Sequence, residues 1–177
     1  MAKQVSIKML EEETKLYSEH IDIPVTIQGQ TEELNIKLYP FFSPTKVRDL
    51  VNSLIEFFKA AEKEKVKVDQ LDEDDLIGFF IVKYFTNLKF TNSKKASTIY
   101  KEFKIAQNSS VFKTLLQAFP EESVKSVMER IYEVRDFNAK FQNMITNVQK
   151  EMQELPLENK EILFPNKSDV SNVLADK

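Results

Sequence analysis

The sequence predicts a mainly α protein of the α+β class, in which an N-terminal β-hairpin is followed by a helical bundle with one long C-terminal helix. Apolar and polar residues alternate between residues 21 and 38, as they do in a half-buried β-ribbon. After that, apolar residues recur every three or four positions, which is the spacing of one helix face. The last and longest of these runs, Glu121 to Leu155, keeps a heptad spacing throughout.

The composition describes a soluble protein with one core. A chain of 177 residues that is 42% hydrophobic has enough apolar material for a single compact domain. A net charge of -3 argues against binding of polyanions by the whole surface. Cysteine is absent, which excludes disulfides, thiolate catalysis and thiolate-bound metals. The N-terminus lacks the apolar core of a signal peptide, and no apolar run approaches the ~20 residues that span a bilayer, so we expect a cytoplasmic protein without a membrane segment.

The first part of the chain is interpreted as a lead-in, residues 1–20, followed by a hairpin, residues 21–39. The hairpin turns at Gly29-Gln30-Thr31-Glu32. Pro24 cannot donate a ladder hydrogen bond, so its strand is expected at the edge of the sheet. Because a two-stranded ribbon is marginal alone, its apolar face must pack on a helix or pair with another chain.

Four shorter segments then lead to the long helix. Ser43-Pro44 is typical of a helix start, with serine as the N-cap and proline in the first turn. Asp72 is predicted to cap a second helix, apolar around most of its circumference between Leu76 and Leu88, with a strand as the alternative. Ser97 and Ser109-Ser110 are predicted to begin two short helices. The predicted α-rich domain covers residues 21–155, and residues 156–177 form a flexible tail.

The long helix carries the strongest signal in the sequence. Its seam has one polar position, Asn138, which would favour a defined register over maximal stability. A helix that packs across its own domain also needs an apolar seam, and Phe137 and Met144 widen this one. Packing within the protomer and assembly between protomers are therefore equally favoured, and we expect a homo-oligomer or another protein partner. The predicted interaction residues are Val127, Ile131, Val134, Asn138, Phe141, Ile145, Val148 and Met152.

The residues for catalysis or metal binding are few. His20 is the only histidine, so a metal site with two histidines cannot be built within one protomer. The acidic run Asp72–Asp75 lacks the alternating ligands and the turn glycine of a calcium loop, and is interpreted as a complement to the helix dipole. The sequence therefore predicts a protein that is not an enzyme and holds neither metal nor cofactor.

A lysine-rich segment, residues 83–113, supports an alternative function. Lysines interleaved with aromatic residues are typical of proteins that bind single-stranded nucleic acid. The segment has no arginine and no known nucleic-acid motif, and its aromatic residues fall at positions that a core needs. A small nucleic-acid-associated regulator is thus the alternative, and a protein partner is favoured over nucleic acid. The candidate basic patch consists of Lys89, Lys94, Lys95, Lys101 and Lys104.

One stretch resembles a known family. Ile23-Pro24-Val25-Thr26-Ile27-Gln28-Gly29 runs through Leu38-Tyr39-Pro40 directly into Ser43-Pro44-Thr45-Lys46-Val47-Arg48-Asp49-Leu50. This is similar to the opening of the tail assembly chaperones of long-tailed bacteriophages, in which a short hairpin ending in an aromatic residue precedes a mainly helical body. The resemblance covers residues 21–64. It implies a non-enzymatic protein of the host cell cytoplasm that binds the tape-measure protein, a long helical structural protein, and self-associates.

Overall fold

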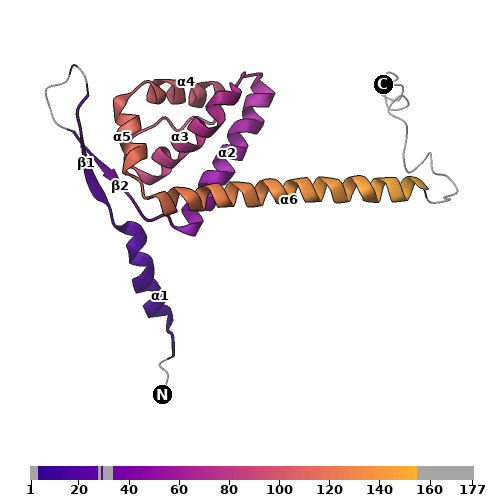
Figure 1. The fold of residues 1–177 in the computed structure, drawn as a ribbon, viewed down its shortest axis with the longest axis horizontal. Coiled ribbons are helices and arrows are strands. Elements are labelled where there is room, and N and C mark those ends of the chain that lie inside the picture. Colours follow the sequence, from indigo (N-terminus) through magenta and orange to yellow (C-terminus); the bar gives the residue numbers. More distant parts are fainter. Residues whose placement is uncertain (1–3, 28, 30–33, 155–177) are drawn as a thin grey trace, which may run out of the picture. The chain divides into compact units, whose positions relative to one another are not determined.

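The computed structural model describes residues 4–27, 29 and 34–154, and confirms the predicted fold class: a two-stranded antiparallel hairpin followed by helices (Figure 1). The chain divides into two compact units, Met1–Tyr132 and Glu133–Lys177. The domain boundaries predicted at residues 20 and 155 stay a prediction, and the predicted tail lies outside the described residues. No helix in the described part of the chain is long and apolar enough to cross a membrane.

The hairpin is joined to the core through its second strand. A short helix, α1 (Ile7–Thr14), and a 3-10 turn, η1 (Lys15–Ser18), precede β1 (Ile21–Val25), which pairs with β2 (Leu34–Leu38). On its other edge, β2 is bonded to the segment after α3: Leu38 forms a bridge with Thr86, and the Asn87 N–H donates to the Lys37 carbonyl at 3.1 Å. Three apolar side chains of the hairpin, Val25, Ile36 and Leu38, are buried, and Pro24 lies on the edge strand as expected.

Helix α2 (Pro44–Glu64) begins as the sequence predicted. The Ser43 hydroxyl oxygen accepts the Lys46 N–H at 3.3 Å, and proline occupies the first turn. One face is buried along the whole helix, through Val47, Leu50, Val51, Leu54, Phe57 and Ala61. The helix ends at Lys65, whose left-handed backbone (φ 55°) closes the last turn.

Helix α3 (Glu73–Phe85) is the central buried helix. Its apolar residues cover most of the circumference, and the alternative of a strand is wrong. The Phe79 ring contacts the rings of Phe80, Phe90 and Phe103 edge-on, with centroids 5.1–5.9 Å apart. Asp72 occupies the N-cap position of α3 as predicted, but its side chain makes no capping hydrogen bond. Asp72 also ends the short 3-10 turn η2 (Gln70–Asp72), and it is buried.

Helices α4 (Ala96–Gln107) and α5 (Ser110–Ala118) cover α3. The first turn of α4 is capped by a residue far away in the sequence: the two carboxylate oxygens of Glu64 accept the N–H groups of Ala96 and Ser97, each at 3.1 Å. The helix therefore begins one residue before the predicted Ser97. Ser109 caps α5 as predicted, through the Val111 N–H at 3.3 Å.

Helix α6 (Glu121–Glu154) is 34 residues long, and its first three turns belong to the first unit. Its start is fixed there by the Ser123 hydroxyl, which donates to the Pro40 carbonyl at 2.6 Å. Four residues later, Val127 is fully buried in the core of that unit. From Glu133 on, the same helix belongs to the second unit.

Candidate interaction surfaces

The predicted heptad residues of α6 divide into a buried start and an exposed continuation. Val127 is 0% exposed and forms part of the core of the first unit. Ile131, Val134 and Ile145 are partly exposed, whereas Asn138 and Phe141 are exposed. The side chains of Val148 and Met152 lie outside the described residues. The sequence left open whether the seam packs within the protomer, and for Val127 it does.

The exposed face of α6 is wider than the predicted seam. Phe137 is 67% exposed, Phe141 45% and Met144 54%. The rings of Phe137 and Phe141 are parallel within 9°, with centroids 6.2 Å apart. These three residues are four and three positions apart, so they share one helix face. Two of them were left out of the predicted interaction set, although this spacing in the sequence marks them.

The heptad positions of these residues indicate what kind of partner the exposed face of α6 can bind. The three-residue and four-residue spacings place Ile131, Asn138 and Ile145 at heptad position a, and Val134 and Phe141 at position d. Phe137 and Met144 then fall at position g, which carries charged residues in a two-stranded coiled coil. An apolar face made of positions a, d and g fits more than one partner helix, or one broad apolar surface. We give the name α6 face to the exposed residues Phe137, Phe141 and Met144 together with the partly exposed Val134 and Ile145.

One lysine of the predicted basic patch, Lys104, is paired within the protein. Lys104 forms an ion pair with the buried Asp72, its ammonium nitrogen lying 2.6 and 2.7 Å from the two carboxylate oxygens. The Tyr100 hydroxyl donates to the same carboxylate at 2.6 Å. Hydrogen bonds from Lys104, and after it Tyr100, lower the pKa of Asp72, and the bond to Asp72 raises the pKa of Lys104. This network ties η2 to α4 across 32 positions of the sequence.

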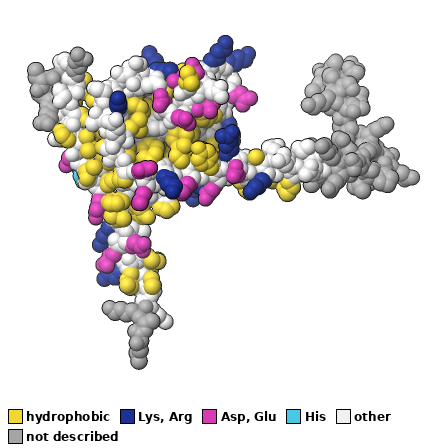
Figure 2. All heavy atoms as spheres, viewed as in Figure 1, with side chains coloured by type: hydrophobic (Ala, Val, Ile, Leu, Met, Phe, Trp, Pro, Cys, Tyr) yellow, Lys and Arg dark blue, Asp and Glu magenta, His cyan; other side chains and the backbone are white. Residues whose placement is uncertain are grey.

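The rest of the lysine-rich segment does not form a stacking surface for bases. Lys89, Lys94, Lys95 and Lys101 are exposed. Figure 2 shows basic side chains of the first unit interspersed with acidic ones on the face in view. The aromatic side chains that alternate with the lysines in the sequence are directed into the protein: Phe85, Phe103 and Phe112 are buried, and Tyr84, Phe90 and Tyr100 are partly buried. The interleaving therefore follows from the helical period of a core.

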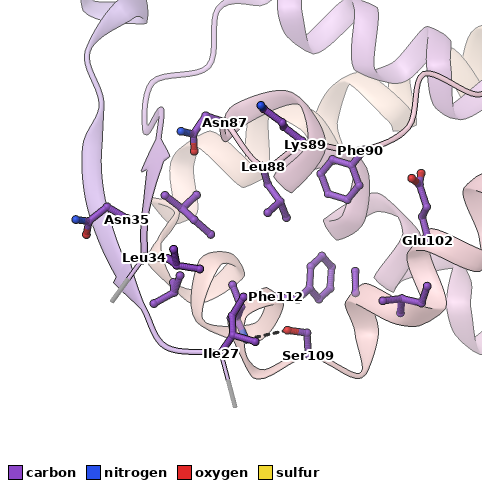
Figure 3. A pocket seen from close by; sticks show the side chains of 15 residues that line it. Ile27, Leu34, Asn35, Asn87, Leu88, Lys89, Phe90, Glu102, Ser109 and Phe112 are labelled. Carbon is purple, nitrogen blue, oxygen red and sulfur yellow. Dashed lines mark hydrogen bonds between the residues drawn. The ribbon is translucent and has the colours of Figure 1, made fainter. Parts of the chain in front are cut away.

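A groove of about 570 Å³ opens in the first unit between the hairpin and the ends of α4 and α5 (Figure 3). Its walls come from the two strands, from residues 87–90 and from both helices, so sequence patterns alone do not reveal it. Most of the lining side chains are apolar. We call it the hairpin groove. It is lined by Val25, Ile27, Leu34, Asn35, Ile36, Asn87, Leu88, Lys89, Phe90, Glu102, Ile105, Ala106, Ser109, Val111 and Phe112.

Glu102, one of the residues that line the hairpin groove, has a buried carboxylate oxygen without a partner among the described residues. Glu102 on α4 accepts the Thr91 N–H through one carboxylate oxygen, at 2.7 Å. Its other oxygen is buried and has no hydrogen-bond partner within the described part of the chain. Buried carboxylate oxygens are normally paired, so this one needs an explanation. No group of three or more His, Asp or Glu side chains among the described residues is placed to hold a metal ion.

The fold and these surfaces define a small hairpin-and-helices protein with an exposed apolar helix face and an apolar groove. The chain belongs to the YomO family, whose model matches residues 7–167. It is 22% identical, over 170 residues, to the SPbeta prophage-derived protein YomO of Bacillus subtilis strain 168, and the match covers 96% of each chain. No solved structure matches the chain significantly.

Proposed function

We propose that this chain is a phage or prophage protein that acts as a tail assembly chaperone: a non-enzymatic protein that binds the tape-measure protein and self-associates in the host cell cytoplasm. The observation that carries the proposal is the α6 face, where three large apolar side chains are about half exposed or more on one helix. Two further points support it. The YomO protein is prophage-derived, and residues 21–64 resemble the opening of tail assembly chaperones.

The α6 face is large enough to drive association. Full burial of a phenylalanine or methionine side chain stabilises by about 1.5–3 kcal/mol, so burying the exposed parts of Phe137, Phe141 and Met144 contributes about 2.5–5 kcal/mol per protomer. Each copy in an assembly contributes the same face again. Contiguous exposed apolar side chains of this kind mark interaction surfaces on other proteins.

The geometry of the second unit fits a long helical partner. The part of α6 from Glu133 to Glu154 extends about 33 Å at the ordinary helical rise. A tape-measure protein with helical apolar stripes presents a surface of the same kind along its length. Assembly on such a partner buries stripes that are otherwise open to aggregation, which is what a chaperone does for a long structural protein.

Co-expression with the tape-measure protein encoded in the same phage genome tests the proposal. We expect the wild-type chain to keep the tape-measure protein soluble and to copurify with it. Phe141→Asp places a charge in the α6 face and should abolish both effects. Asn143→Asp adds the same charge on the exposed opposite side of the helix and should preserve both. A tape-measure protein that is equally soluble with and without the chain would overturn the chaperone function.

A further inference from the structure

We propose that the α6 face binds the same face of a second copy of this chain, with the two helices antiparallel and related by a twofold axis that passes between Asn138 and Phe141. This inference deepens the proposed function: it rests on the self-association proposed there and specifies how two copies meet. All residues of the α6 face lie in the second unit, Glu133–Lys177, so the pairing needs no contact from the first unit.

The seam of α6 matches itself when one of the two helices is reversed. In an antiparallel pair of helices, position a of one helix packs beside position d of the other. The register that brings Asn138 beside Phe141 of the second copy also brings Val134 beside Ile145. Because of the twofold symmetry each of these contacts occurs twice, as an interface between two identical surfaces requires.

The apolar residues at position g, Phe137 and Met144, also match in this register. In an antiparallel pair, position g lies beside position g of the other helix, and Phe137 comes to lie beside Met144 of the second copy. These side chains are 67% and 54% exposed in the protomer. The ring of Phe137 is stacked on that of Phe141, so the apolar surface is continuous from position g to position d. Pairing therefore removes all the apolar side chains of the α6 face from water together, which is favourable.

A parallel pair of the same helices would match poorly. There, position g lies beside position e of the next heptad on the other helix, and the residues at these two positions determine the orientation of the pair. This arrangement would place Phe137 beside the polar Gln142 and Arg130 beside Arg135 of the second copy. The first contact leaves a large apolar side chain without an apolar partner, and the second brings two like charges together. The apolar and the charged positions thus both favour the antiparallel pair.

Arg130 and Asn138 specify the register of the antiparallel pair. Sliding the second copy by one heptad toward the start of α6 would place Arg130 beside Met144, where a charged group would lose water without gaining a partner. In the proposed register the two Asn138 side chains occupy neighbouring layers, about 4.5 Å apart along the helix axes, where their amides can bond to each other. A polar residue within an apolar seam fixes the register in this way.

Distances between spin labels on the full chain test the orientation. The chain contains no cysteine, so Lys140→Cys and Asn147→Cys each carry one label per copy. Both residues are exposed at heptad position c, away from the α6 face. In the antiparallel pair the two labels are offset along the helix axes by about 1.5 Å at position 140 and about 22 Å at position 147, whereas an in-register parallel pair has no offset at either. Double electron–electron resonance should therefore give a distance about 5 Å or more longer for the 147 label than for the 140 label.

A mixture of two variants tests the contact between Phe137 and Met144. Phe137→Asp and Met144→Lys should each have the protomer mass in light scattering and keep the helical circular dichroism signal, because both residues are exposed. Mixed together, they should form a complex of twice the protomer mass, since one contact becomes an ion pair and the other keeps its wild-type residues. Phe137→Asp mixed with Phe137→Lys is the matched control: it carries the same two charges but does not bring them together, and it should keep the protomer mass.

Equal label distances at positions 140 and 147 would overturn the proposal, because they indicate a parallel pair. A wild-type chain with the protomer mass would overturn it as well, and so would a mixture of Phe137→Asp and Met144→Lys that stays at the protomer mass. These failures are distinct from a failure of the chaperone function. A chain with the protomer mass that still keeps the tape-measure protein soluble would refute only the pairing, whereas an antiparallel pair that leaves the tape-measure protein insoluble would support the pairing and refute the chaperone function.

Discussion

Tyr100→Phe removes one hydroxyl group from the network around the buried Asp72. The hydroxyl donates to the Asp72 carboxylate at 2.6 Å and accepts the Asp69 N–H at 3.4 Å. A hydrogen bond to a charged group contributes about 1.5–3 kcal/mol. Asp72 keeps its bonds from Lys104 in the variant, so the carboxylate is not left alone, and the lower end of that range applies: about 1.5 kcal/mol.

Urea denaturation followed by circular dichroism measures this loss as a decrease in the free energy of unfolding. Tyr132→Phe is the matched control, because this exposed tyrosine should change stability by less than about 0.5 kcal/mol. If Tyr100→Phe were as stable as the control, the Tyr100 hydroxyl would not contribute to the attachment of η2 to α4.

Two further predictions concern the first unit. Because hydrogen bonds from Lys104 and then Tyr100 lower the pKa of Asp72, its contribution to stability is complete above the ordinary aspartate pKa and is lost as the pH falls through the lowered value. The urea midpoint of the wild type should therefore fall more steeply on acidification than that of Asp72→Asn, and equal slopes would contradict the network. Glu64→Ala should lower the urea midpoint at neutral pH because the first turn of α4 loses its acceptor, whereas Glu62→Ala should not; equal midpoints for the two variants would refute the cap.

The local features of the fold could be predicted from the sequence because they depend on neighbours in the chain. The Ser43-Pro44 helix start, the alternation of the hairpin and the apolar run of α3 all follow from patterns within a few residues. Asp72 shows the limit of that reasoning. Its position before a helix indicated a cap, but its partners are Tyr100 and Lys104, about thirty positions away in the sequence. A pattern of neighbouring residues cannot predict such a contact.

In the candidate sites too, features set by neighbouring residues could be predicted, and features that depend on distant residues could not. The α6 face could be predicted in part, since heptad spacing is a local pattern, but the spacing does not reveal that Val127 is buried while Phe141 is exposed. The hairpin groove could not be predicted, because strands, a connecting segment and two helices must be placed together before it exists. The unpaired oxygen of Glu102 becomes visible only once its surroundings are known.

Light scattering of the purified chain tests the central claim most directly, namely that the α6 face is an assembly surface. The wild-type chain should have a mass that is a multiple of the protomer mass, and so should Asn143→Asp. Ile145→Asp should have the protomer mass while keeping the helical circular dichroism signal of the wild type, because Ile145 lies on the α6 face outside the core of the first unit. A wild-type chain with the protomer mass, or an Ile145→Asp variant as large as the wild type, would contradict the claim.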